Sequence, residues 1–310
     1  MKIFPNTIIN FHAIDDQKWI DSTFNLLKNN YQLVSLQDIK QYYYSKVKLS
    51  NSCHITFDDG DYSFYKNVYP LIIKHRIPVS IYVSPEVIKN RTNFWFQEIR
   101  GYDQQMLRHI ISEIFHDKTF RELQIPIIAI FKSISLKSIN DVISRYQKLT
   151  NTPPKPTFNI SYPQLKEIYN SGLVSIGAHT QNHPILKNET DEVAEYEIVS
   201  SVVELSEMLD SKVEFFAFPN GIPGLDFGQR EINYLKQAGI CLSFSTENKT
   251  FTSKDNPLAI PRNGLSYGNS SFTLFKLIMG SRWDSFKRAI KGKQEIDYRK
   301  MIQKNSETTS

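Results

Sequence analysis

Two acidic residues stand side by side where a strand-like segment ends, and their position suggests metal chemistry. Asp58 and Asp59 follow residues 53–57 and precede Gly60. Adjacent carboxylates repel each other, so a positive charge must compensate for them, and one divalent cation is sufficient. Glycine permits the sharp turn that aims both side chains at one point. The same three residues also make an ordinary turn, so the pair alone leaves both interpretations open.

Two histidines spaced four residues apart strengthen the metal hypothesis. His179 and His183 follow the strand-like segment 173–177, with small and polar residues between them. Together with an aspartate of the first loop they form a ligand set typical of a catalytic divalent ion that keeps open coordination positions. The alternative is a turn at His183 and a hydrogen-bonded core role for His179. Zinc is the ion we expect for these ligands, although cobalt, nickel and iron also suit them.

A third loop offers backbone donors rather than charged groups. The segment 216–221, with the sequence FAFPNG, places Asn220 and Gly221 directly after another strand-like run. Backbone N–H groups at the end of a strand can face an oxyanion that develops during a reaction. The alternative is that Pro-Asn-Gly forms a plain turn.

The elements that must position these loops alternate between strands and helices. Strands are predicted at 7–12, 53–57, 79–83, 173–177, 213–218, 240–245 and 257–262. Helices are predicted at about 19–29, 36–44, 63–75, 162–170, 191–209, 227–238 and 271–290. This alternation predicts a parallel α/β sheet whose site lies at the carboxyl ends of the strands.

Residues 84–160 interrupt the alternation. They contain helical candidates at about 102–117 and 135–149 and end in a proline-rich stretch. We interpret about 91–158 as a mostly helical insertion packed on the barrel. The chain is therefore expected to form one catalytic domain over 1–290, followed by a polar, basic tail over 291–310.

Composition excludes some functions and favours a compartment. The 310 residues are 40% hydrophobic and carry a net charge of +5, with the basic excess concentrated between 276 and 304. A general basic field for nucleic acid is therefore not supported. Two cysteines cannot make a disulfide framework, so a reducing compartment is expected.

Membrane features are sparse in the sequence. No apolar run reaches the roughly 18 residues that a membrane span needs, and the N-terminal residues lack a signal peptide pattern. We therefore expect a cytoplasmic protein. The basic amphipathic stretch near the C-terminus can lie on the inner face of an anionic membrane, although docking on the barrel is the simpler interpretation.

The three loops, taken in order, resemble the motifs of a known family. TFDDG at 56–60, HTQNHP at 179–184 and FAFPNG at 216–221 are similar to those of the polysaccharide deacetylases, known as carbohydrate esterase family 4 or the NodB homology domain. The resemblance covers roughly residues 5–90 and 160–265. It implies a distorted (β/α) barrel of about seven parallel strands and a metal-dependent hydrolase that removes an N-acyl group, most often N-acetyl, from a sugar.

The resemblance also implies a role for each matching residue. Asp58 corresponds to the catalytic base, and Asn220 to the residue whose backbone N–H stabilises the oxyanion. The metal ligands correspond to Asp59, His179 and His183.

The sequence departs from the family pattern at two places. Many members have an arginine at the position of Ala217 that holds the base, and Arg262 is our candidate replacement, against the alternative of an ordinary surface arginine. Typical members also have a late general-acid histidine, but no histidine follows His183. The acid must then come from His12, a water on the metal or the substrate. Trp95 is a candidate pocket wall, against the alternative of a core aromatic residue.

The missing late histidine keeps two other functions open. One is a non-catalytic, metal-containing relative that binds glycans. The other is an O-acetyl esterase, whose oxygen leaving group needs less help from an acid. For the enzyme, we expect a substrate from polysaccharide or glycoconjugate biosynthesis, such as a nucleotide-linked or lipid-linked sugar.

Overall fold

One parallel sheet forms the centre of the computed structural model, which describes residues 4–115, 125–280, 282–283 and 293–309. The order of neighbouring strands is β7-β6-β5-β4-β3-β1-β8, and β2 pairs with the start of β3. The strands are β1 (Thr7–Phe11), β2 (Gln32–Leu33), β3 (Ser52–Phe57), β4 (Val79–Val83), β5 (Val174–Ala178), β6 (Phe215–Ala217), β7 (Leu242–Phe244) and β8 (Asn263–Gly264). All pairings between these strands are parallel, as the sequence predicts.

The last segment of the sheet links its two edges. Ile260 makes a parallel bridge with Phe244 beside β7, and Asn263 pairs with Ile9 of β1. The strand predicted at 257–262 is therefore misplaced: within those residues only Ile260 makes a bridge, and the regular pairing begins after them, at the two residues of β8. These contacts curl the sheet, and the expectation of a distorted barrel is confirmed.

Helices cover both faces of the sheet, so its central strands are buried. Every residue of β1, β3 and β4 is buried, which is typical of parallel strands flanked by helices. The surrounding elements are α1 (Gln17–Asn30), α2 (Leu36–Tyr44), η1 (Phe64–Val68), α3 (Tyr69–His75), α10 (Tyr162–Asn170), η2 (Leu186–Asn188), α11 (Asp191–Leu209), α12 (Gln229–Gln237) and α13 (Ser270–Met279). The beginning of α13 agrees with the prediction, while residues 284–290 of that prediction lie outside the described residues.

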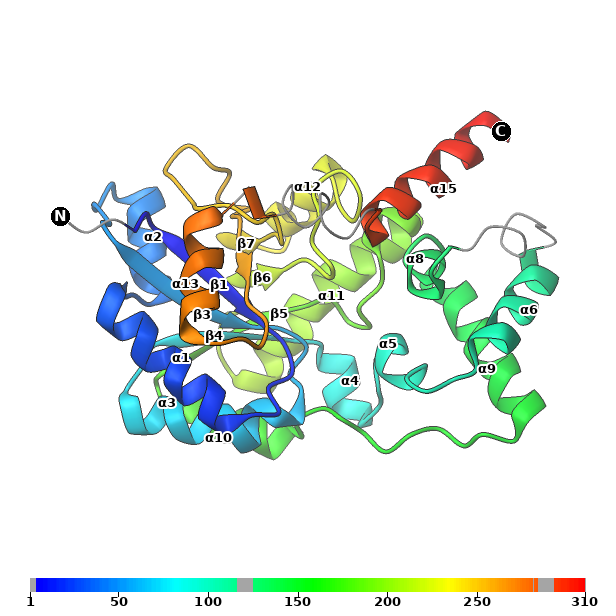
Figure 1. The fold of residues 1–310 in the computed structure, drawn as a ribbon, viewed down its shortest axis with the longest axis horizontal. Coiled ribbons are helices and arrows are strands. Elements are labelled where there is room, and N and C mark those ends of the chain that lie inside the picture. Colours follow the sequence, from blue (N-terminus) through cyan, green and yellow to red (C-terminus); the bar gives the residue numbers. More distant parts are fainter. Residues whose placement is uncertain (1–3, 116–124, 281, 284–292, 310) are drawn as a thin grey trace.

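The insertion forms a helical group beside the sheet (Figure 1). Helix α4 (Pro85–Asn90) leads into the insertion, whose own helices are α5 (Trp95–Glu98), α6 (Gln104–Phe115), α8 (Ile127–Phe131) and α9 (Leu136–Thr150). Helices α5, α6, α8 and α9 share an apolar cluster of their own, whereas Ile88 of α4 belongs to the cluster beneath the sheet. The predicted helices correspond to α6 and α9, but α4, α5 and α8 are too short for helical periodicity to reveal them.

The C-terminus is a docked helix, so the expected tail is incorrect for most of its length. Helix α15 covers Glu295–Thr309, and its residues Tyr298 and Ile302 pack against the apolar cluster of the insertion. Arg299 of the same helix is buried and forms an ion pair of 2.5 Å with Asp226. The polar composition hides this narrow apolar face. Among the described residues, no helix combines the length and hydrophobicity needed to span a bilayer.

Candidate metal centre

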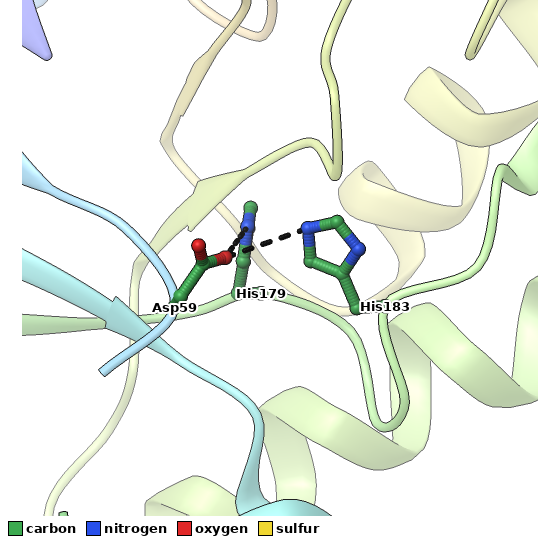
Figure 2. A group of neighbouring side chains, drawn as sticks. All are labelled: Asp59, His179 and His183. Atoms are coloured by element: carbon green, nitrogen blue, oxygen red, sulfur yellow. Dashed lines mark ion pairs between the residues drawn. The ribbon is translucent and has the colours of Figure 1, made fainter. Parts of the chain in front are cut away.

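The three predicted metal ligands come together at the carboxyl ends of β3 and β5, which flank β4 in the sheet (Figure 2). Asp59 follows β3, and His179 follows β5. The Oδ1 atom of Asp59 lies 3.5 Å from Nε2 of His179 and 3.5 Å from Nε2 of His183. All three side chains are buried, so the structure brings the sequence-predicted set to one point.

These distances suit a shared ion better than direct pairing. Metal–ligand bonds of about 2.1 Å at tetrahedral angles separate the ligand atoms by about 3.4 Å. The Oδ1 atom of Asp59 is buried and has no hydrogen-bond partner within the described parts of the chain. A buried carboxylate oxygen without a partner is costly unless a ligand satisfies it. The residues present therefore fit a divalent metal ion.

Backbone conformation marks the same loops. Asp59, His183 and Asn220 have φ angles of 72°, 59° and 57°. These values lie in the left-handed region, which residues other than glycine rarely adopt. Gly60 has φ 66°, and an added Cβ there would lie 3.0 Å from Cγ1 of Val83. Strained backbone held by its surroundings is common at functional sites. The sharp turn expected at Gly60 is present.

Neighbouring groups orient the two histidine rings. Nδ1 of His179 lies 2.7 Å from the carbonyl oxygen of Ala217, so it carries the proton and leaves Nε2 free to bind a metal. The ring of His183 packs against Phe94 and Phe96, with centroids 5.3 and 5.0 Å away. Nε1 of Trp95 donates a hydrogen bond of 3.2 Å to the His183 carbonyl. The insertion thus supports the metal loop.

Arg262, which directly precedes β8, holds the predicted base. Its two terminal nitrogens each donate a 2.8 Å hydrogen bond to one carboxylate oxygen of Asp58. Asn10 donates a further bond of 3.1 Å to the same carboxylate. Arg262 is completely buried, so the alternative of a surface arginine is wrong. Burial opposes ionisation of Asp58, but the charge and hydrogen bonds of Arg262, together with the nearby His179 and His12, outweigh it and hold the pKa of the carboxyl below its ordinary value.

A cavity of about 250 Å³ opens beside the metal ligands. It is lined by His12, Asp59, Trp95, Phe96, Ile128, Lys132, His183 and Asn220. His12 follows β1 and is exposed, whereas the Nδ2 atom of Asn220 is buried and has no partner among the described residues. Trp95 is buried and also lines the cavity, so it is both a core aromatic residue and a pocket wall.

Sequence comparison agrees with this geometry. The profile of the family described as polysaccharide deacetylase matches residues 46–242, more than half of the chain. The chain belongs to the polysaccharide deacetylase family. Curated relatives from several Staphylococcus aureus strains are named poly-beta-1,6-N-acetyl-D-glucosamine N-deacetylase. They are 25% identical over 255 residues, which is 79% of this chain but 63% of the relative, so the chain spans less than two thirds of their length.

Solved structures share the fold of this polysaccharide deacetylase family member. The deacetylase PplD of Streptococcus pyogenes, in complex with acetate, superposes with a TM-score of 0.60 at 15% identity, over 88% of this chain and 98% of that one. IcaB from Ammonifex degensii gives a TM-score of 0.59 at 16% identity, over 88% and 97% of the two chains. At these identities the likeness concerns the fold alone.

Glu197 is a supporting residue that the sequence motifs did not reveal. It lies on α11, is buried, and accepts hydrogen bonds from the backbone N–H of Asn182 at 2.8 Å and from its side-chain amide at 3.0 Å. Glu197 thereby fixes the loop between the two histidines. Burial raises the pKa of Glu197 to about 7. Its only sequence signal is a glutamate on the otherwise apolar face of a long helix.

Metal affinity is expected to fall as the pH is lowered through neutrality. A histidine must lose its proton to bind a metal. Burial alone would lower the pKa of His179, but the neighbouring Asp59 and Asp58 raise it above the ordinary value. Burial lowers the pKa of His183 to about 3, so His183 stays neutral. We therefore expect about tenfold weaker binding for each pH unit below the pKa of His179.

Zn²⁺ competition with a chelator between pH 8 and pH 5.5, corrected for protonation of the chelator, measures this dependence. A His75→Gln variant is the control, because His75 pairs with Asp21 away from the site and its loss should leave the dependence unchanged. Equal affinity at pH 8 and pH 5.5 would contradict the assignment of His179 as a ligand.

Proposed function

We propose that this protein is a metal-dependent hydrolase that removes an N-acetyl group from a sugar in a polysaccharide or glycoconjugate. The observation that carries the proposal is the buried cluster of Asp59, His179 and His183 with the ionised Asp58 beside it. Family membership and the names of the curated relatives support the same reaction. We propose zinc as the ion, because two histidines and one carboxylate are typical zinc ligands.

Each residue then has a chemical task. A bound divalent ion supplies Lewis-acid chemistry, polarising the acyl carbonyl and acidifying water. Asp58 accepts the proton of the attacking water, and Arg262 keeps its carboxylate ionised and correctly oriented. The backbone N–H of Asn220 donates a hydrogen bond to the oxyanion.

His12 is our proposal for the acid that protonates the departing amine, because it lines the cavity beside Asp59. Replacing it in a His12→Gln variant is expected to lower kcat on an N-acetyl sugar by about 100-fold, within the usual range for a general acid. The kcat on an O-acetyl ester should fall much less, because its leaving group needs less protonation. His109→Gln, an exposed histidine of α6, is the control and should keep full activity. Equal losses on amide and ester would contradict this role.

The proposal extends to where the protein acts and to the group that carries its sugar substrate. We propose a cytoplasmic enzyme of polysaccharide biosynthesis that acts on a nucleotide-linked or lipid-linked sugar and touches the inner face of the membrane. In support, Phe275 and Ile278 of α13 are exposed on either side of basic Lys276. Apolar residues interleaved with basic ones favour contact with anionic lipid surfaces.

The decisive experiment measures released acid together with bound metal. Its substrates are N-acetylated and N-formylated sugars, offered free, nucleotide-linked, lipid-linked and as poly-β-1,6-N-acetylglucosamine. Release of acetate by the metal-loaded wild type supports the enzyme and identifies its substrate. Bound metal with glycan binding but no release favours the non-catalytic relative. Absence of metal binding after reconstitution would refute the proposal.

A further inference from the structure

One cation on the wall of the metal cavity has no part in the reaction described above. Lys132 follows α8 of the insertion and lines the cavity together with Asp59, His183 and Asn220. Its side chain is only 19% exposed and is therefore largely shielded from bulk water. A cation that gives up most of its hydration needs compensating contacts, which here come from the C-terminal helix.

Helix α15 supplies that compensation. Nζ of Lys132 donates a 2.9 Å hydrogen bond to Oε2 of Glu295 at the start of α15. One turn later, Arg299 anchors the helix through its buried ion pair with Asp226. Asp226 in turn accepts a 2.8 Å hydrogen bond from the backbone N–H of Ile222, in the loop that contains Asn220. The pair of Lys132 and Glu295 is therefore held in a fixed place relative to the metal loops.

The lining of the cavity combines polar residues with aromatic ones. Asp59, His183 and Asn220 bring polar groups, whereas Trp95 and Phe96 bring aromatic surface. A sugar ring offers the same combination, with apolar C–H groups on its faces and hydroxyl groups on its rim. Pockets that bind small ligands commonly join an apolar lining to a few placed polar groups. An ammonium group has three N–H donors, and Glu295 accepts one of them.

We propose that Lys132 is a specificity-determining residue that binds hydroxyl groups of the sugar whose N-acetyl group is cleaved, with Glu295 positioning it. This rests on the proposed function. The pairing with Glu295 also selects the charge of the substrate. Because the carboxylate neutralises the ammonium group, the pair suits a neutral N-acetylhexosamine chain and disfavours an acidic one. Glu295 lies outside the segment that matches the family profile, whereas Lys132 lies within it.

The test compares variants of the zinc-loaded, full-length protein on a β-1,6-linked N-acetylglucosamine tetramer. Lys132→Met keeps the apolar stem and removes the ammonium group, and it is expected to raise KM about 10- to 100-fold, as for loss of a charge-assisted hydrogen bond. Its kcat should change less than about threefold. Lys40→Met is the matched control, because Lys40 forms a similar half-buried pair at 2.7 Å with Glu214, which precedes β6 at the end of the strand away from the metal ligands. Its KM should stay at the wild-type value.

A second comparison addresses charge selection. Glu295→Gln leaves the Lys132 cation without its partner, so binding of a heparosan tetrasaccharide, which alternates N-acetylglucosamine with an acidic sugar, should tighten at least severalfold. Calorimetry with the zinc-loaded Asp58→Asn protein measures binding of both oligomers without turnover. An unchanged KM in Lys132→Met, or a lowered kcat and melting temperature at constant KM, would overturn the proposal.

The two proposals can fail separately. In one outcome the wild type releases no acetate, the tetramer binds the Asp58→Asn protein, and the double variant Asp58→Asn/Lys132→Met no longer binds it. The deacetylase function is then wrong and the sugar site stands. If the wild type releases acetate and Lys132→Met behaves like Lys40→Met, the function stands and the sugar site is wrong. If neither acetate release nor binding that depends on Lys132 is seen, both proposals fall.

Discussion

Asp58→Asn is expected to reduce acetate release by about 10³-fold while the metal stays bound. General-base catalysis typically contributes about 10² to 10⁴, and an amide cannot accept the proton of water. Asp58 is not one of the three clustered ligands, whose donor atoms belong to Asp59, His179 and His183. Steady-state release of acetate and elemental analysis of the purified variant measure the two outcomes.

The control for this variant must account for lost stability. Asparagine at position 58 leaves the buried charge of Arg262 without its partner, which costs about 3–5 kcal/mol when a buried pair is broken. Asp226→Asn breaks a second buried pair, with Arg299, which contacts neither Asp58 nor the three metal ligands. It should lower the melting temperature comparably while keeping kcat within about tenfold of the wild type. Activity of Asp58→Asn within tenfold of the wild type would show that another group is the base.

The metal ligands could be predicted because local sequence determines them. Asp59 and His179 each directly follow a buried strand, and parallel strands bring their carboxyl ends to one edge. The four-residue spacing of His179 and His183 then makes convergence a local property of one loop. Strand positions were also predictable, since β1, β3 and β4 are continuous buried segments.

Other parts of the site depend on contacts that no local pattern encodes. Arg262 reaches Asp58 across 204 positions of the chain, so sequence offered it only as one candidate. Glu197 contacts the metal loop from a helix whose own pattern indicates burial alone. Lys132 and Glu295 are 163 residues apart. Lys132 directly follows a five-residue helix, and Glu295 lies in a segment that looks like a polar tail. Only the folded chain shows that these residues meet.

Arg262→Met is the second variant with a large expected effect, because it removes the charge that keeps Asp58 ionised. In the native protein the lowered pKa of Asp58 contributes stability above the pKa of the unfolded chain, and this contribution is lost as the pH falls through the folded-state pKa. Without Arg262, burial dominates and the pKa rises. The variant should therefore lose about 3–5 kcal/mol of unfolding free energy at pH 7 and less at acidic pH.

The same change should move catalysis in a direction that simple destabilisation does not. If Asp58 is the base, the acid limb of the pH profile of kcat/KM shifts to higher pH in Arg262→Met, because the pKa of the Asp58 carboxyl is raised. Arg299→Met is the matched control, since it removes an equally buried arginine from an aspartate outside the reaction. It should lower the free energy of unfolding and leave the acid limb in place. An unshifted acid limb in Arg262→Met would mean that the pair of Arg262 and Asp58 only stabilises the fold and that a group other than Asp58 accepts the proton of water.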